Sequence, residues 1–227
     1  MRPYLLIHEY ILRTHAKSGF ILANSKFTLD SYIKYGCKGA VVYYPCNIKG
    51  FHPSPNKKNI VISVGRISPE RAHEVTLEIA SLVPETRFIL LGRIENKKYY
   101  CKLLKLAPPN VKILPNPKRA EIIKFLSIGK VYINSRFMET FGVAVVEGMA
   151  SGCVPVVRDH GAVKETVTDE VGFRWKTIEE AADYIRALLN NERLFREMSL
   201  KAMERAREFT PEKFEGRVAT TLATLLR

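Results

Sequence analysis

The sequence predicts an α/β fold: a Rossmann-like parallel sheet with helices on both faces, preceded by a small remnant of a second Rossmann domain. Short apolar runs alternate with helical segments from residue 59 to the C-terminus. Most of these runs are apolar on both faces, which is typical of parallel strands covered on both sides. A proline-rich stretch at residues 45–59 separates this pattern from a shorter one before it.

The shorter pattern contains four expected elements. They are a helix at 5–16, a strand at 19–25, a helix at 25–36 and a strand at 40–45. Ser25 is the expected N-cap of the second helix and Gly36 its end. We therefore expect residues 1–45 to be the remnant of a separate N-terminal domain and residues 46–58 to be a linker.

The longer pattern is expected to form one ligand-binding domain, residues 59–210. Strands are predicted at 59–65, 86–92, 110–115, 130–135, 154–159 and 170–175, and helices at 74–83, 96–107, 119–129, 141–152, 177–190 and 192–209. Residues 211–227 are expected to form a C-terminal helix that packs back on the N-terminal part, with Pro211 in its first turn.

Composition narrows the class of partner. The formal charge of +13 favours anionic partners, although a solvated basic surface is the plainer explanation. We expect no nucleic-acid binding, because no recognition signature accompanies the charge; peripheral docking on anionic lipid is a more natural use of it. The spacing of the four cysteines predicts neither a metal site nor a disulfide scaffold, so we expect a cytoplasmic protein.

A first candidate site follows the strand at 59–65. Gly65 would let a ligand approach the backbone, and Arg66 and Arg71 offer guanidinium groups to phosphate oxygens. Ligands bind at the carboxyl ends of parallel strands, which is where these residues fall. The alternative is a glycine turn with two surface arginines.

The second candidate site gives the stronger signal. Glu139 precedes a turn at Phe141 and Gly142 that opens a helix, and Glu147 lies on that helix. The amides of Phe141 to Val143 and the helix N-terminus favour a diphosphate, with Glu139 reaching sugar hydroxyls and Glu147 reaching ribose hydroxyls. The alternative is a buried helix with ion-paired glutamates, but the apolar surroundings of Glu147 make an unpartnered carboxylate costly there.

A third, weaker candidate is the turn at residues 159–167. Gly161 would place backbone amides beside the same crevice, and Glu165 lies within the turn. His160 is a polar neighbour for which we expect no catalytic role, since most single histidines are structural or solvated.

Together these segments resemble the family 4 retaining glycosyltransferases of the GT-B fold. The matching segments, in order, are ILANSKFTLDSYIKYG, VVYYPCNIKGFHP, SVGRISPER, ETFGVAVVE with its two glutamates seven residues apart, and GAVKETV. The resemblance covers nearly the whole chain. Two departures are Arg71, where relatives more often have Lys, and His73, where glycine is frequent and which favours GDP-mannose over UDP-glucose as the donor.

The resemblance implies a residue assignment and a reaction. Arg66 and Arg71 would stabilise the leaving diphosphate, Glu139 would hold the donor sugar as the third catalytic residue, and Gly65, Phe141, Gly142, Val143, Glu147 and Gly161 would bind the nucleotide-sugar. A hexose would pass to a lipid-linked or glycan hydroxyl with retention of configuration and without a metal or other cofactor.

The resemblance also leaves an alternative open. Family members have a complete N-terminal domain, whereas only residues 1–45 precede the linker here. Either a partner chain supplies the acceptor domain, or the protein is a non-catalytic nucleotide-sugar-binding subunit or a degenerate transferase.

Overall fold

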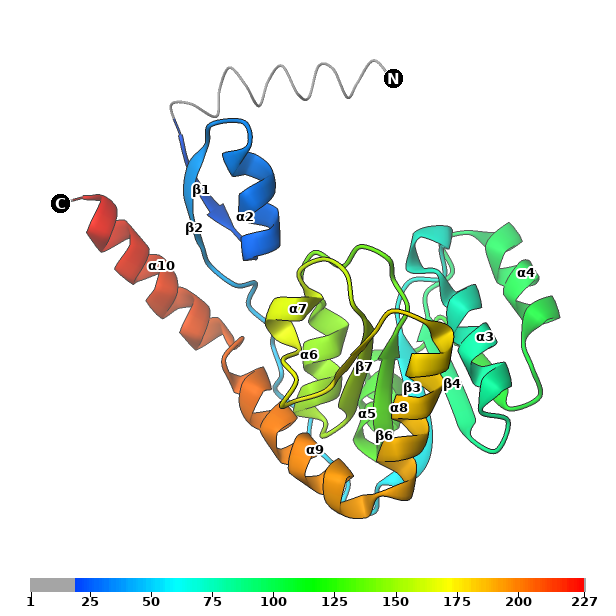
Figure 1. Ribbon diagram of the computed structural model, residues 1–227. Helices are drawn as coiled ribbons and strands as arrows, with labels where there is room; N and C mark the ends of the chain where they lie inside the picture. Colours follow the sequence, from blue (N-terminus) through cyan, green and yellow to red (C-terminus); the bar gives the residue numbers. More distant parts are fainter. Residues whose placement is uncertain (1–18, 227) are drawn as a thin grey trace.

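The computed structural model describes residues 19–226, which form a large α/β body and a smaller N-terminal unit (Figure 1). The sheet of the body has the order β5-β4-β3-β6-β7-β8, and all its strand pairs are parallel. Its strands are β3 (Lys58–Val64), β4 (Arg87–Gly92), β5 (Val111–Pro115), β6 (Gly129–Asn134), β7 (Val154–Arg158) and β8 (Phe173–Trp175). The predicted α/β fold with a parallel sheet is confirmed.

Helices cover both faces of this sheet. They are α3 (His73–Leu82), α4 (Lys97–Leu106), α5 (Arg119–Ile128), α6 (Val143–Ala150), the short α7 (Val163–Thr166), α8 (Ile178–Asn190) and α9 (Glu192–Arg207). A single 3-10 turn, η1 (Pro69–Arg71), precedes α3. The strand order reverses between β3 and β6, which is where open parallel sheets leave a crevice at their carboxyl edge.

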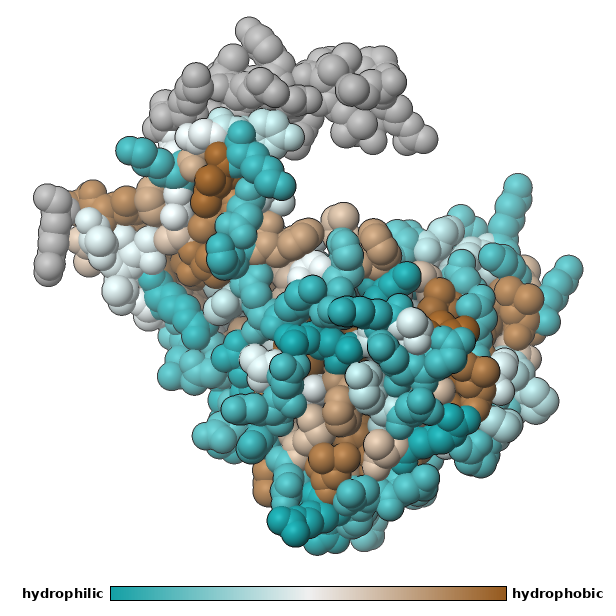
Figure 2. Space-filling view, viewed as in Figure 1, coloured by the Kyte–Doolittle hydropathy of each residue, from teal (hydrophilic) through white to brown (hydrophobic). Residues whose placement is uncertain are grey.

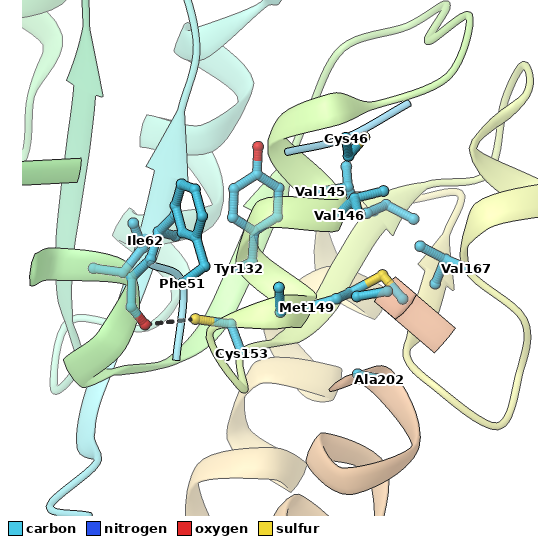
Figure 3. Packing of buried hydrophobic residues seen from close by; sticks show 14 of the residues in the cluster. Cys46, Phe51, Ile62, Tyr132, Val145, Val146, Met149, Cys153, Val167 and Ala202 are labelled. Carbon is cyan, nitrogen blue, oxygen red and sulfur yellow. Dashed lines mark hydrogen bonds between the residues drawn. The ribbon is translucent and has the colours of Figure 1, made fainter. Parts of the chain in front are cut away.

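The alternation of side chains along β3 separates two cores. Ile60 and Ile62 pack with residues of α5, α6 and α9, whereas Val61 packs on the opposite face with residues of α3 and α8. Figure 3 shows the first core around α6, with Phe51, Tyr132 and Met149 close together. Burial on both faces explains why these strands are apolar along their whole length.

The N-terminal unit consists of β1 (Phe20–Ala23), α2 (Lys26–Ile33) and β2 (Lys38–Val41), with β1 and β2 parallel. Ser25 caps α2 as predicted, because its side chain accepts a hydrogen bond from the amide of Thr28. The strand predicted at 40–45 differs: β2 (Lys38–Val41) ends at Val41, which pairs with Ala23, the last residue of β1. The helix predicted at 5–16 lies outside the described residues.

Residues 46–57 run along the body rather than away from it. The amide of Cys46 donates to the carbonyl of Phe209, and Phe51 is buried in the first core. The Lys57 ammonium donates to the carbonyls of Leu126, Gly129 and Ser151 at 3.2, 2.6 and 2.6 Å. Burial lowers the pKa of Lys57, and the three carbonyls compensate the buried charge.

The C-terminal helix α10 (Pro211–Leu225) extends from the body beside the N-terminal unit (Figure 1). The guanidinium of Arg217 lies 5.4 Å from the ring centre of Tyr43, and the Tyr43 ring lies edge-on to Phe209 at 5.5 Å. These contacts join the two parts of the chain at one junction. No helix within residues 19–226 is long and apolar enough to cross a membrane.

Candidate functional site

A cavity of about 380 Å³ opens at the carboxyl ends of β3 and β6. Its walls combine the turn after β3, the loop after β6, the start of α6, and Asn24 and Tyr44 of the N-terminal segment. Eight of the predicted site residues line it: Gly65, Arg66, Arg71, Glu139, Phe141, Gly142, Val143 and Glu147. The fold therefore brings two candidate sites that are far apart in the sequence into one place.

The carboxylate of Glu139 accepts four hydrogen bonds in the wall of the cavity. One carboxylate oxygen accepts from Arg136 at 2.9 Å and from the amide of Thr140 at 3.1 Å. The other accepts from Arg71 and from the side-chain amide of Asn134, both at 3.4 Å. Glu139 is only 6% exposed, so its carboxylate is a buried charge. The two guanidinium groups and the two amides hold it in a fixed orientation.

The two predicted arginines have different surroundings. Arg71 reaches Glu139, and its Nε is a buried donor without a hydrogen-bond partner among the described residues. Burial is the largest cause that lowers the pKa of Arg71. Arg66 is exposed and pairs with Glu95 at 3.0 Å and Glu70 at 3.4 Å. Arg71 is therefore the arginine already directed at the cavity.

The turn at Gly142 starts α6 at the cavity wall. Gly142 has φ 93, a conformation that favours glycine, and the amides of Val145 and Val146 donate to its carbonyl. The amides of Val143 and Ala144 belong to the first helical turn, where the helix supplies no acceptor. This helix end and Arg71 together give the cavity a positive region suited to a diphosphate.

Glu147 lies one turn into α6 and is also buried, at 7% exposure. Arg119 at the start of α5 donates to it at 2.8 Å, and the guanidinium of Arg119 stacks on the Phe51 ring at 4.7 Å. Burial raises the pKa of Glu147, and the charge of Arg119 only partly opposes this. This carboxylate therefore retains acceptor capacity for a hydroxyl-bearing ligand.

Gly161 does not line the cavity but lies directly behind Glu139. It forms a parallel bridge with Glu139, has φ 82, and a Cβ there would clash with the Glu139 carbonyl oxygen. The amide of Ala162 donates to that same carbonyl at 2.7 Å. The turn thus supports Glu139 from outside the cavity.

The rest of this turn connects the cavity to the N-terminal unit. The Glu165 carboxylate accepts from the amides of Lys26 and Phe27 at 2.8 and 2.9 Å, so it caps α2 from a distant part of the sequence. Thr166 donates to the carbonyl of Phe141 at 3.0 Å. His160 stacks on Phe137 with ring centres 4.3 Å apart, outside the cavity.

His73, singled out by its departure from relatives, lies beneath the turn after β3. Its Nε2 is 2.9 Å from the carbonyl oxygen of Arg66, and burial lowers the pKa of the ring. A Cβ on Gly65 would lie 3.4 Å from the His73 ring. His73 therefore supports the Gly65–Arg66 backbone from below.

Sequence reasoning missed Asn134, Arg136 and Arg119. Asn134 is the last residue of β6, Arg136 comes two residues later and Arg119 follows β5, so all three obey the rule that places ligand sites at carboxyl strand ends. That rule was the available signal, since no local motif marks them. No group of three His, Cys, Asp or Glu side chains within residues 19–226 is arranged to hold a metal ion.

Comparison with known proteins identifies the family. The sequence model of Glycosyl transferases group 1 matches residues 47–209. The chain is 25% identical over 221 residues to a GDP-Man:Man(3)GlcNAc(2)-PP-Dol alpha-1,2-mannosyltransferase of Dictyostelium discoideum, covering 85% of this chain and 44% of the relative. It is 30% identical over 171 residues to the sulfoquinovosyl transferase SQD2 of Arabidopsis thaliana, covering 73% and 32%. The chain thus spans less than half the length of these relatives.

A solved structure shares the fold. Anabaena Alr3699/HepE in complex with UDP-glucose superposes with a TM-score of 0.81 and 21% sequence identity, covering 95% of this chain and 68% of that one. The likeness shows a common architecture for the body, the junction and the N-terminal unit.

Proposed function

Because the chain belongs to the Glycosyl transferases group 1 family, we propose that it binds a nucleoside-diphosphate hexose in the cavity between β3 and β6 and transfers the hexose to an acceptor hydroxyl. One observation carries this proposal: two groups of hydrogen-bond donors lie side by side in the cavity wall. They are the N-terminus of α6 and Arg71, whose buried Nε has no hydrogen-bond partner among the described residues. Both features stabilise an anion that gains charge as it leaves.

In the proposed reaction the bond between the anomeric carbon and the diphosphate oxygen breaks, and its electron pair remains on the diphosphate. The acceptor oxygen bonds to the same face, so configuration is retained, and its proton passes to the departing phosphate. Arg71 and the amides of Val143 and Ala144 neutralise the leaving group. Arg66 adds positive charge once its guanidinium leaves Glu95 and binds phosphate. The scheme uses no metal.

The two carboxylates fix the donor in this proposal. Glu139 orients the hexose through its hydroxyls, and Glu147 accepts from the ribose on the other side of the diphosphate. GDP-mannose is the proposed donor, supported by His73 beneath Gly65 and by relatives whose names specify GDP-Man. UDP-glucose, the ligand named for the Anabaena structure, is the alternative donor.

The acceptor side requires more polypeptide than the described unit provides. A two-stranded parallel sheet with one helix is marginal alone, and Phe20, Leu22 and Ile33 remain exposed on it. We propose that a partner or further chain completes this unit and binds a glycan or lipid-linked acceptor in the cytoplasm. The same exposed strands favour a second candidate, a donor-binding subunit without catalysis of its own.

Calorimetric titration of the purified chain with GDP-mannose, GDP, UDP-glucose and UDP tests the donor site. We expect micromolar binding of the guanine pair, reduced at least tenfold by Arg71→Gln, with Arg93→Gln as the control because Arg93 is exposed outside the cavity. Binding of none of the four, or equal losses in both variants, would contradict the proposed site. Tighter binding of UDP-glucose and UDP would mean that the donor is UDP-glucose, bound at the same site.

Turnover distinguishes the two candidate functions. If the chain is catalytic, addition of the polypeptide that completes the acceptor side releases nucleoside diphosphate at a rate that Glu139→Ala abolishes. Donor binding that persists without release identifies the non-catalytic subunit.

A further inference from the structure

Helix α4 carries charge of one sign on its outward face. Lys97, Lys98, Lys102 and Lys105 are all exposed, and the helix has no acidic residue. Within residues 19–226 the only carboxylate in ion-pair range of these four is that of Glu74, 3.8 Å from Lys102. Figure 1 shows α4 at the outer edge of the body, on the side away from α10 and the N-terminal unit.

The other long surface helices are built differently. On α9, Arg193 pairs with Glu197 at 2.8 Å and Arg196 pairs with Glu192 at 2.9 Å. On α8, Arg186 pairs with Asp183 at 3.1 Å. Mixed, paired charges are the ordinary pattern of a solvated helix. Lysines without a carboxylate partner on their own helix, with only Lys102 reaching Glu74 on α3 among the described residues, therefore set α4 apart from the general basic character of the protein.

Apolar side chains accompany these lysines. Leu104 and Leu106 are 50% and 52% exposed, and Cys101 is exposed between Lys97 and Lys105. A groove of about 560 Å³ runs along the helix, lined by the four lysines, Cys101 and Leu106. The groove has ammonium groups at its rim, while lysine stems, Cys101 and Leu106 provide apolar surface.

We propose that α4 is the surface through which this protein docks on a membrane rich in anionic lipid. Lysine ammonium groups complement lipid phosphates, and half-exposed leucines can enter the headgroup layer. Nucleic acid fits less well, because Tyr99 is buried and Tyr100 half-buried, so α4 presents no exposed aromatic ring for a base to stack on.

Docking through α4 would bring the donor cavity close to the lipid surface. Lys97 follows the carboxyl end of β4, and the cavity opens at the carboxyl ends of β3 and β6, so both lie at one edge of the sheet. The proposal extends the proposed function by naming the surface that would bring a lipid-linked acceptor within reach, but lipid binding itself does not depend on a working donor site.

The test is sedimentation of the purified chain with vesicles of phosphatidylcholine alone or mixed with phosphatidylserine, at low and high salt. We expect sedimentation only with the anionic vesicles, weakened by salt. Replacing all four α4 lysines by Gln should reduce the partition coefficient by roughly six hundredfold, at about fivefold per lysine. Leu104→Ser should reduce it by a smaller factor.

The matched control removes four positive charges from the mixed-charge helix, by Arg193→Gln, Arg196→Gln, Lys201→Gln and Arg207→Gln. We expect this variant to sediment like the wild type. No sedimentation at low salt, an equal loss in the control, or α4-dependent binding to a DNA duplex in place of vesicles would each overturn the proposal. Calorimetry with GDP-mannose on the α4 variant keeps a failed donor site distinct from failed docking.

Discussion

Glu139 and Glu147 are both buried carboxylates on the wall of one cavity, yet the protein holds them differently. Glu139 is bonded to two guanidinium groups, a side-chain amide and a backbone amide, whereas the carboxylate of Glu147 has Arg119 as its single partner within residues 19–226. The side chain of Arg119 is 55% exposed, so solvent screens its charge.

In the proposed donor site, this difference would give the two carboxylates different roles. The Glu139 end is ordered before a ligand arrives, and a ligand there meets fixed geometry. The Glu147 end is incompletely compensated, because burial raises the pKa of this carboxyl beyond what Arg119 offsets. A ligand that donates hydroxyl groups to Glu147 would relieve this imbalance, which links donor binding to stabilisation of α6.

The largest effect that separates the two ends is expected from Gly161→Ala. The new Cβ would clash with the Glu139 carbonyl and occupy a backbone with φ 82, so the Glu139 end loses its geometry. We expect urea denaturation to show a loss of about 2–4 kcal/mol and calorimetry to show no donor binding.

Gly216→Ala is the control for this change. Gly216 lies inside α10, and a Cβ there meets nothing within 4 Å. The substitution should raise stability by up to about 1 kcal/mol. Equal stability of the Gly161 and Gly216 variants would show that the bridge to Glu139 is not needed.

The second effect is the removal of the Glu139 carboxylate itself. Glu139→Ala leaves the partly buried Arg71 and Arg136 facing each other without their shared anion. Breaking such a pair should cost about 2–3 kcal/mol in urea denaturation, while Glu180→Ala, at the exposed start of α8, should cost about 1 kcal/mol. Unchanged or higher stability of Glu139→Ala would mean that hydration of the two arginines replaces the lost ion pairs.

Removal of the Glu147 charge should raise the free energy of unfolding, whereas removal of the Glu139 charge lowers it. A carboxyl whose folded pKa is raised binds more protons in the folded than in the unfolded state, so stability falls as pH rises from about 4.3 through the folded value. Glu147→Gln should therefore be more stable than the wild type near pH 8, by less than about 1 kcal/mol. The difference should vanish below about pH 4.

Thermal unfolding of both proteins across this pH range measures the effect. If the stability of the wild type relative to Glu147→Gln increases with pH, the ion pair with Arg119 outweighs the cost of burying the carboxylate. That result would reverse our assignment of the two ends.

The most local effect concerns the turn behind the Glu139 end. Glu165→Gln keeps one acceptor for the amides of Lys26 and Phe27 but presents an NH₂ group to the other, at a cost of about 1 kcal/mol. Faster hydrogen exchange at these two amides, with no change in α8, is the expected result. Unchanged exchange would mean that Ser25 alone secures the start of α2.

Sequence reasoning reached the fold because its signals are local. The strands of the body are apolar along their length, and Ser25 marks the start of α2. It placed Glu139, Glu147 and Arg71 near one another because parallel strands present their carboxyl ends to a common edge. The same reasoning expected a plain turn after β7, where Val163–Thr166 form the short helix α7.

The partners of these residues could not be predicted from local pattern. Arg119 meets Glu147 across 28 positions and Glu165 meets Lys26 across 139, and such pairings depend on how helices pack. The length of β2 likewise depended on where its neighbour β1 ends rather than on its own apolar residues. The assignment of the individual site residues stays a prediction.

The partly buried Lys57 has a consequence for how the molecule can move. Its three carbonyl partners fasten the incoming chain to the ends of α5 and α6, and the bond from Cys46 to Phe209 fastens it again upstream. Residues 46–57, which by composition resemble a hinge, are thus bonded to the body at both ends. A movement of the N-terminal unit against the body would have to break the bonds from Lys26 and Phe27 to Glu165. It would also have to bend the chain at residues 42–45, where the Tyr43 ring packs against Phe209 and Arg217.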